Sequence, residues 1–153
     1  MKQILVKDVY KLVGPASLSV PEDTPLREII YRFAHDPGVR AIFLVDSKER
    51  FVGMIRRVDL AKWVNMRLFG KPGGKAVPTG EIVRLALADK AKDLARGDSE
   101  SMAVHPEDTL QTAMNRMISF KEAIIPVVDK EGKILGDLRI SEVLLKALEM
   151  EEA

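Results

Sequence analysis

The chain has 153 residues and contains no cysteine, which excludes disulfide bonds, thiolate nucleophiles and cysteine-based metal sites. Histidine is scarce as well. Only His35 and His105 occur, and neither stands near the spaced carboxylates that a metal site would need. The sequence offers no nucleophile paired with a base. We therefore expect a protein that is not an enzyme and requires no cofactor.

The chain also lacks any run of about 18 apolar residues, so no segment is expected to cross a membrane. Its first residues lack the long apolar core of a signal peptide, and a cytoplasmic location is expected. The net charge is +1, with the positive excess in residues 1–90 and the negative excess in residues 91–153. This imbalance is too mild to indicate nucleic-acid binding, and it is compatible with two pockets of which the first attracts anions more strongly.

The chain does contain an internal repeat: the same series of short motifs occurs twice, about 84 residues apart. In each copy a Pro-Glu-Asp-Thr tetrapeptide is followed by a Val-Asp pair and by a Gly seven residues after that Asp. An Arg comes three residues after the Gly, and an acidic residue three residues after the Arg. The two series are Pro21–Thr24, Val45-Asp46, Gly53, Arg56, Asp59 and Pro106–Thr109, Val128-Asp129, Gly136, Arg139, Glu142. A unit of about 60 residues is only marginally stable alone, so we expect two like units packed together.

Apolar periodicity predicts the order strand, helix, strand, strand, helix in each repeat. The first repeat is expected to have strands at 18–20, 41–45 and 51–55 and helices from Pro25 and over 57–68; the second, strands at 102–104, 123–128 and 134–138 and helices from about 110 and over 140–150. The strand–helix–strand crossover favours a parallel pair, and the tight turn after it forces an antiparallel one. The predicted class is therefore α+β, with α/β-type repeats built on three-stranded mixed sheets.

The segment between the repeats, residues 70–80, is rich in Gly and Pro and is interpreted as a linker. Helical periodicity resumes from Glu81 to Ala95, and residues 6–9 and 91–94 resemble matching lead-in helices, one ahead of each repeat. The expected division is a first repeat over 1–69 with its lead-in helix, the linker, and a second repeat over 81–153 with its own.

These motifs resemble those of a tandem pair of CBS domains, also called a Bateman module. The resemblance rests on the second repeat's Val104–Leu110 and Ile125–Asp129 and on the paired motifs Gly53–Asp59 and Gly136–Glu142. It covers residues 17–68 and 101–150. It implies two β-α-β-β-α repeats packed with pseudo-two-fold symmetry.

The resemblance also implies a function. Members of the family commonly bind an adenosine-containing ligand such as AMP, ADP, ATP or S-adenosylmethionine in the cleft between the repeats. They regulate an attached or partner enzyme, channel or transporter, and they usually form homodimers through their helices. We therefore expect an adenine-nucleotide-binding regulatory module whose effector protein is unknown. Trp63, Leu145 and Met150 exceed what one buried helix face needs and agree with such an interface.

The ligand-binding residues implied by the resemblance fall into two groups. Asp59 and Glu142 would each accept the ribose hydroxyls. Residues flanking the adenine would be Ser17, Leu18, Arg40, Ile42, Phe43, Ser101, Met102, Ala123, Ile125 and Pro126. Ile42, Phe43 and Ile125 are equally well explained as ordinary core, and Phe43 stands where the family usually has Pro.

Arg56 and Arg139 depart from the family, which often places Thr or Ser there. Two roles stay open. Each arginine could bind a ligand phosphate, with Arg57 adding positive charge in the first repeat, or it could pair with Asp59, Glu142 or a neighbouring acid and fill the site. The second role predicts a different function, that of a ligand-free dimeric scaffold or interaction module.

Overall fold

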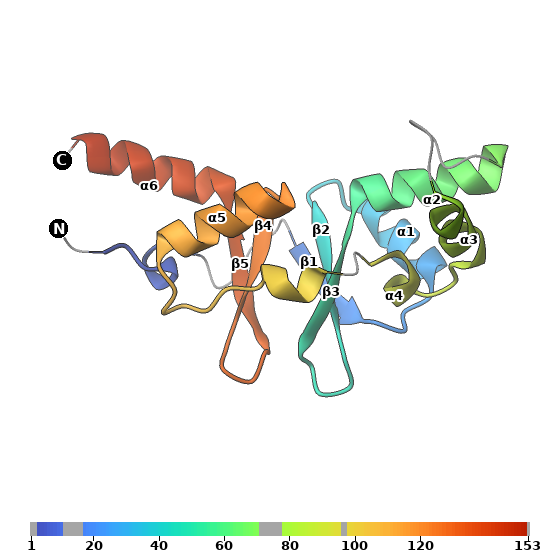
Figure 1. The fold of residues 1–153 in the computed structure, drawn as a ribbon, viewed down its shortest axis with the longest axis horizontal. Helices are drawn as coiled ribbons and strands as arrows, with labels where there is room; N and C mark the ends of the chain where they lie inside the picture. The colour runs from blue at the N-terminus through green and yellow to red at the C-terminus, as the bar shows by residue number, and fades with distance from the viewer. Residues whose placement is uncertain (1–2, 11–16, 71–77, 96–97, 153) are drawn as a thin grey trace. The chain divides into compact units, whose positions relative to one another are not determined.

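A computed structural model of the chain describes residues 3–10, 17–70, 78–95 and 98–152 (Figure 1). Most of the expected linker, residues 71–77, lies outside the described residues. The structure is α+β, with two repeats of strands and helices. Its elements are η1 (Val6–Asp8), β1 (Ser17–Pro21), α1 (Leu26–His35), β2 (Ala41–Val45), β3 (Phe51–Arg56), α2 (Arg57–Phe69), α3 (Thr79–Leu87), α4 (Ala91–Leu94), η2 (Ser99–Met102), α5 (Leu110–Phe120), β4 (Ile124–Val128), β5 (Ile134–Arg139) and α6 (Ile140–Glu152).

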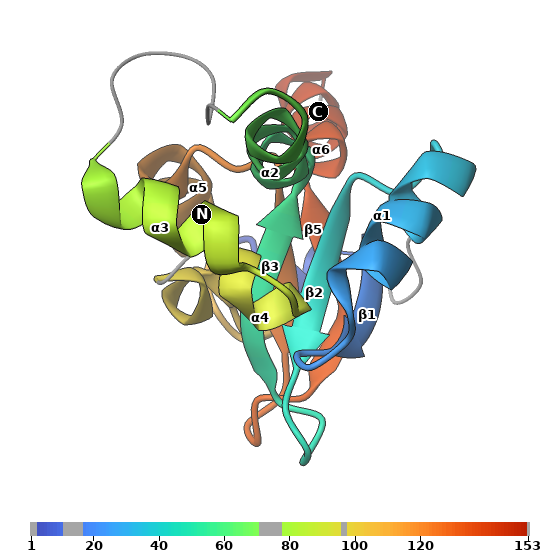
Figure 2. The same cartoon turned by 90° about the vertical axis from the view of Figure 1, so that its right-hand side faces the viewer.

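The first repeat forms a three-stranded sheet in the order β1-β2-β3, as its sequence predicts. β1 and β2 are parallel because α1 carries the chain between them, and Leu18 lies opposite Ile42 in the register. Helices α1, α3 and α4 lie on one face of this sheet (Figures 1 and 2). Apolar side chains of these helices, of the sheet and of α2 form one core that includes Leu26, Ile29, Ile42, Leu44, Ile55, Leu60, Leu85 and Leu94.

The contacts divide the chain into two compact units that do not follow the sequence order. The first-repeat unit comprises residues 15–48 and 52–99, and the second-repeat unit comprises residues 1–14, 49–51 and 100–153. The expected ranges, 1–69 and 81–153, group each lead-in segment with the repeat that follows it. In the compact units the pairing is the reverse: the segment that contains η1 belongs with the second repeat, and the segment that contains α4 belongs with the first.

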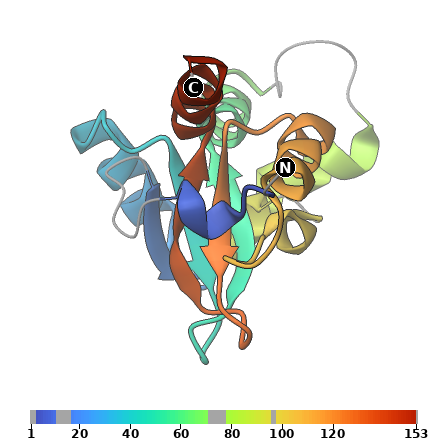
Figure 3. The same cartoon turned by 90° about the vertical axis from the view of Figure 1, so that its left-hand side faces the viewer.

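The start of the chain belongs to the second-repeat unit. The N–H of Val6 donates to the carbonyl oxygen of Asp108 (2.8 Å), and the N–H of Lys7 donates to the carbonyl oxygen of Pro106 (2.9 Å). In return, the N–H of Leu110 donates to the carbonyl oxygen of Ile4 (2.8 Å). Val6 is fully buried. Accordingly η1 lies on the same face of the β4–β5 hairpin as α5 (Figure 3).

The segment around α4 joins the first-repeat unit in the same manner. The N–H of Leu26 donates to the carbonyl oxygen of Asp89 (3.0 Å), and the N–H of Ala91 donates to that of Thr24 (2.8 Å). Ala91 and Leu94 are buried. Each Pro-Glu-Asp-Thr signature is therefore the place where a lead-in segment from elsewhere in the sequence attaches.

The helical periodicity expected from Glu81 to Ala95 is divided between two helices, α3 and α4, and the lead-in helix expected at 91–94 is confirmed as α4. The physical cause of the division is Asp93, whose carboxylate Oδ2 accepts the N–H groups of Lys90 (2.9 Å) and Asp89 (3.0 Å). These N–H groups cannot then bond within a continuous helix, and a new helix begins at Ala91.

The second repeat has a two-stranded antiparallel sheet, β4-β5, where three strands were expected. Of the predicted strand at 102–104, Val104 alone makes an isolated parallel bridge, to Val127, and Met102 ends the short helix η2. The N–H of Val104 donates to the carbonyl oxygen of Pro126 (3.0 Å), and the N–H of Val128 donates to that of Val104 (2.8 Å). Because η2 curls the chain just before it, the entry strand is reduced to this one bridge.

The two hairpin turns follow the sequence prediction. Asp46 Oδ1 accepts the N–H of Lys48 (2.9 Å), and Asp129 Oδ1 accepts those of Glu131 and Lys133 (both 2.9 Å). Gly53 is closely packed, since a Cβ there would lie 3.0 Å from the Cβ of Ala95. In the described part of the chain no helix is long and apolar enough to span a bilayer.

Candidate functional site

The junction between β3 and α2 holds an ion pair between Arg56 and Asp59. Arg56 ends the strand and Asp59 lies in the first helical turn, so the three-residue spacing folds the carboxylate back onto the strand end. Arg56 Nη2 lies 3.0 Å from Asp59 Oδ1, and Arg56 Nε lies 3.2 Å from Asp59 Oδ2. The backbone N–H of Arg56 also donates to Oδ2 (2.9 Å). Asp59 is only 6% exposed, so the pair is largely shielded from water on the acid's side.

These contacts determine how many further hydrogen bonds the carboxylate of Asp59 can accept. Each carboxylate oxygen accepts about two hydrogen bonds. Oδ2 already receives two donors from Arg56, and Oδ1 receives one. One further donor fits on Asp59 without moving Arg56, and a vicinal diol would need room for two.

The equivalent junction between β5 and α6 is arranged differently. Arg139 Nε donates to Asp137 Oδ1 (3.1 Å) and lies 3.5 Å from Glu142 Oε1, which also accepts the backbone N–H of Arg139 (3.2 Å). Asp137 is 1% exposed and Glu142 is 9% exposed. The second carboxylate oxygen of Glu142, Oε2, is buried and has no hydrogen-bond partner among the residues that the structure describes. An unpartnered buried oxygen of this kind is a ready acceptor for a hydroxyl or amino group.

Asp137 is the residue that sequence reasoning missed. Its signal was a single acid within the otherwise largely apolar strand Ile134–Arg139. A buried acid in a strand requires a cationic or hydrogen-bonding partner. Arg139, two residues later, provides one.

Arg57 is used inside the first-repeat unit. Its guanidinium donates to the carbonyl oxygens of Pro37 (2.8 Å, from Nη2) and Val39 (2.9 Å, from Nη2) and lies 5.9 Å from the centre of the Phe33 ring. Sequence reasoning assigned Arg57 an added positive charge for a ligand in the first repeat, and in the structure its guanidinium is held by these carbonyl oxygens.

Arg84, on α3, is a second cation near Asp59. Its side chain forms a two-pronged pair with Glu81, with Nη2 at 2.6 Å from Oε1 and Nε at 3.0 Å from Oε2. The hydrogen bond with Glu81 raises the pKa of Arg84 most, and the charge of Asp59 raises it further. The same hydrogen bond lowers the pKa of Glu81. The negative charge of Asp59 is thus felt by two arginines, one in direct contact and one at longer range.

The residues expected to flank adenine divide by exposure. Ile42, Phe43, Met102, Ile125 and Pro126 are buried, Ser17 and Leu18 are half-buried, and Arg40, Ser101 and Ala123 are exposed. The structure brings Ser17 and Leu18 beside Ala41 and Ile42, as neighbours on adjacent strands. Ala123 precedes β4, and its carbonyl oxygen accepts the N–H of Ile140 (2.9 Å), so it lies next to the Arg139 junction. Ile42 lies in the hydrophobic core of the first-repeat unit.

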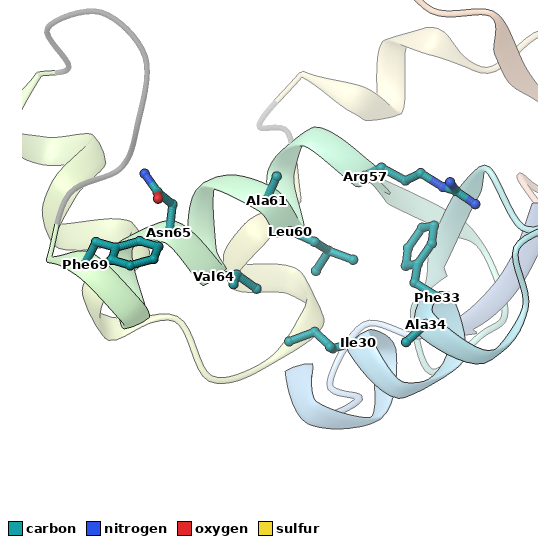
Figure 4. Close-up of a pocket in the computed structure, with 9 residues that line it drawn as sticks. All are labelled: Ile30, Phe33, Ala34, Arg57, Leu60, Ala61, Val64, Asn65 and Phe69. Carbon is teal, nitrogen blue, oxygen red and sulfur yellow. The ribbon is translucent and has the colours of Figure 1, made fainter.

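Three hollows lie within single units. A groove of about 490 Å³ between α1 and α2 has mostly apolar walls, and in Figure 4 Ile30 and Phe33 turn toward Leu60 and Val64 across it. A smaller hollow of about 300 Å³ is bounded by Leu18, Val39 and the stacked rings of Tyr31 and His35, whose centres are 4.0 Å apart. A third, of about 540 Å³, lies in the second-repeat unit and is lined by charged residues of both signs. Among the described residues no group of three or more His, Asp or Glu side chains is placed to hold a metal ion.

Comparison with known proteins identifies the family. The family model of the CBS domain matches residues 3–65 and again residues 91–149. No curated protein sequence matches the chain. The structure of a CBS domain-containing protein from Thermotoga maritima is similar, with 32% sequence identity, coverage of 95% of each chain and a TM-score of 0.72.

Two further solved structures share the fold and carry ligands. A CBS domain protein from Pyrobaculum aerophilum complexed with AMP is 21% identical, with coverage of 98% of this chain and 100% of that one and a TM-score of 0.67. The CBS domain pair of protein MJ0100, in complex with 5′-methylthioadenosine and S-adenosyl-L-methionine, is 14% identical, with coverage of 99% and 100% and a TM-score of 0.68. The two matched segments, the two repeats and these likenesses agree: the chain belongs to the CBS-domain family, as a tandem pair of CBS domains.

Proposed function

We propose that this CBS-domain pair is a non-catalytic regulatory module that binds an adenosine-containing ligand and passes its bound state to a partner protein. The observation that carries the proposal is a buried carboxylate at the same strand–helix junction of each repeat, Asp59 in one and Glu142 in the other. Related structures bind AMP in one case and 5′-methylthioadenosine and S-adenosylmethionine in another, which supports an adenosine-containing ligand class.

The two carboxylates suit a ribose. A carboxylate can accept both vicinal hydroxyls, one on each oxygen, through charge-assisted hydrogen bonds. The buried Oε2 of Glu142, which has no hydrogen-bond partner among the described residues, retains the capacity to accept such a hydroxyl if the side chain turns toward a ligand. Among the expected adenine-flanking positions, Ser17 and Leu18 are half-buried, and Ser101 and Ala123 are exposed.

Signalling requires that the ligand bind two conformations with different affinities. The Arg56–Asp59 pair supplies a feature that would differ between the free and bound states, because a ribose and the guanidinium compete for the same oxygens. The partner would read the resulting change at the start of α2.

We also propose that the module acts as a homodimer joined through its helices. Leu68 and Phe69 on α2 and Leu144, Leu145 and Leu148 on α6 are exposed, and α2 and α6 occupy equivalent positions in the two repeats. A two-fold dimer brings the same patch of two copies together, so a chain with apolar residues on these helices is suited to pair with itself.

Thermal unfolding with candidate ligands tests the binding proposal. A ligand at 100 times its dissociation constant stabilises by about 2.7 kcal/mol, which is readily measured. We expect AMP, ADP, ATP, S-adenosylmethionine or 5′-methylthioadenosine to raise the melting temperature, and Glu142→Gln to weaken the effect of at least one of them. Glu151→Gln, an exposed change on the same helix, serves as the matched control. No stabilisation by any of the five ligands would refute the proposal.

A second function is supported by a specific observation. Arg56 and Asp59 form an ion pair at the β3–α2 junction, as expected for a dimeric scaffold whose sites are filled by its own side chains. In that case none of the five ligands would bind, and the chain would still form a dimer in sedimentation equilibrium.

A further inference from the structure

We propose that the apolar groove between α1 and α2 receives α6 of a second copy of the chain, so that the first repeat of one copy pairs with the second repeat of the other. The proposal rests on the homodimer of the proposed function and specifies which helices meet. Three observations carry it: the apolar walls of the groove, the exposed leucine stripe of α6 and the opposite charges of the two surfaces.

The groove combines apolar walls with an arginine at one end. Ile30 and Phe33 of α1 face Leu60 and Val64 of α2 across it, and Arg57 lies where α2 begins (Figure 4). Nε and Nη2 of Arg57 donate to carbonyl oxygens of the same unit, and Nη1 has no acceptor among the residues that the structure describes. This remaining nitrogen can donate to a carboxylate of an incoming partner.

The border of the groove is positively charged. Arg27 precedes Ile30 by three residues and Ala34 by seven, so it shares the face of α1 on which both of them line the groove. Glu28 is paired with Arg32 (3.8 Å) on its own helix. Within α1 and α2, every residue of which is described, the exposed charged residues are five cations and one acid: Arg27, Arg32, Arg57, Lys62, Arg67 and Glu28. A partner for this groove should therefore be apolar at its centre and acidic at its edge.

α6 has this combination of an apolar centre and an acidic edge. Leu144, Leu145 and Leu148 are exposed, and their spacing of one and four residues sets them on one stripe of the helix. Glu151 and Glu152 continue the same stripe in the last turn of the helix and are exposed as well. A helix with apolar anchors on one face is a usual occupant of an apolar groove.

Charge distinguishes α6 from the other surface that a second copy could offer, its own groove. Exposed acids of α6 are Glu149, Glu151 and Glu152, whereas Lys146 is half-buried. Contact between two grooves would bring two cationic surfaces together, and contact between the groove and α6 brings opposite charges together. Arg57 at the start of α2 meets the acids at the end of α6 when the two helices run in opposite directions. In a two-fold dimer each copy gives its α6 and receives that of its partner.

Sedimentation equilibrium of the full chain at two salt concentrations provides the first test and needs no variant. Between about 0.01 and 0.15 M NaCl the Debye length falls from about 30 to about 8 Å, so the attraction between opposite charges is screened. We expect the affinity of the dimer to fall at least about 3-fold over this range. Contact between two cationic grooves would instead be strengthened by salt.

Charge reversal tests the same contact from both sides. Glu149→Lys, Glu151→Lys and Glu152→Lys together should weaken dimer formation at least about 10-fold. Arg27→Glu with Lys62→Glu should weaken the wild-type dimer, yet the same two changes should raise the affinity of the variant with a basic α6. The control has the same change in net charge at exposed positions outside these helices and should form a dimer like the wild type: Glu49→Lys, Glu100→Lys and Glu131→Lys.

Crosslinking identifies the contacting helices directly, because the chain has no cysteine of its own. Ala61, which lines the groove, and Leu148 each lie one turn from the helix end that bears the charges. Ala61→Cys and Leu148→Cys are mixed until subunits exchange and are then treated with a short bismaleimide. We expect a covalent dimer from the mixture and almost none from either variant alone. Ile118→Cys, on the exposed face of α5, replaces Leu148→Cys in the control and should not crosslink to position 61.

The inference is overturned if salt or the two groove changes tighten the wild-type dimer, or if position 61 crosslinks to itself, or 148 to itself, in place of the mixed pair. A dimer that yields none of these crosslinks would overturn it too. Each of these results leaves the homodimer of the proposed function standing. A chain that stays monomeric at every concentration would refute the homodimer and this inference together, while ligand binding is decided separately by thermal unfolding.

Discussion

Arg57 donates twice to the carbonyl oxygen of Val39, from Nη2 at 2.9 Å and from Nε at 3.3 Å. A third hydrogen bond from Nη2 reaches the carbonyl oxygen of Pro37. Val39 precedes β2 by two residues, and Arg57 begins α2. One side chain therefore fixes the end of the α1–β2 connection to the start of α2, immediately beside the Arg56–Asp59 pair.

Replacement of Arg57 should destabilise the first repeat. Arg57→Gln removes three hydrogen bonds from a charged donor, and we expect the free energy of unfolding to fall by about 1–2 kcal/mol after allowance for solvent exposure. Chemical denaturation of the variant beside Arg27→Gln, an exposed arginine on α1, measures the effect. Equal stability of the two variants would show that the carbonyl contacts contribute nothing.

Asp93 should make stability depend on acid. Its pKa is lowered from the ordinary value of 3.8, chiefly by the hydrogen bonds from the N–H groups of Lys90 and Asp89. Because the folded pKa lies below the unfolded one, the ionised carboxylate stabilises the fold fully above about pH 4. This contribution is lost as pH falls through the folded pKa.

We therefore expect Asp93→Ala to lower the free energy of unfolding by about 1 kcal/mol at pH 7, as is typical of a lost helix cap. The difference from the wild type should shrink below about pH 4. Urea titrations between pH 7 and pH 3 measure it, with Asp89→Ala, an exposed neighbour, as the control. A difference that stays constant down to pH 3 would contradict this account.

Because each lead-in segment packs with the other repeat in the sequence, a core mutation in one segment should destabilise the repeat with which it packs. Val6 and Leu94 are both buried, and each lies in the lead-in segment that packs with the other repeat. Val6→Ala should cost about 2 kcal/mol and lower amide protection mainly in residues 102–152. Leu94→Ala should lower it mainly in residues 17–70. Hydrogen exchange measured by mass spectrometry tests this. If each lead-in segment packed with the repeat that follows it in the sequence, Val6→Ala would instead lower amide protection in residues 17–70.

The proposed dimer predicts that a charge on α6 separates the copies. Leu145 is 69% exposed and Ile118 on α5 is 68% exposed, so lysine is tolerated at either site in the single chain. Leu145→Lys should shift sedimentation equilibrium toward the monomer, and Ile118→Lys should not. A wild-type monomer, or a dimer unaffected by Leu145→Lys, would refute an interface on α6.

The local parts of this fold could be predicted from the sequence. A continuous apolar run such as Ala41–Val45 indicates a buried strand, and Asp46 and Asp129 mark turns by capturing backbone N–H groups nearby. The acid three residues after each arginine also indicated a contact at the helix start. These signals lie within a few residues of the structure that they specify.

The features of the fold that could not be predicted from the sequence depend on which of several available groups a side chain or segment contacts. Helical periodicity runs from Glu81 to Ala95, but α3 and α4 separate where the carboxylate of Asp93 accepts the N–H groups of Asp89 and Lys90. Arg139 could have paired with Glu142 alone, and the burial of Asp137 in the same strand decides otherwise. The attachment of η1 near Pro106 joins segments about 100 residues apart, and no local pattern records it.

The reversed pairing of the lead-in segments has a consequence for how the protein is made. When η1 leaves the ribosome, Pro106 and Asp108, whose carbonyl oxygens it will contact, have not yet been synthesised. The first-repeat unit likewise cannot form its hydrogen bonds from Leu26 to Asp89 and from Ala91 to Thr24 until Asp89 and Ala91 have been synthesised. Domains that fold during synthesis usually do so one after another from the amino terminus. Here neither unit is complete until the chain has passed well beyond its middle, and the second-repeat unit closes only when the opening residues of the chain meet its later ones.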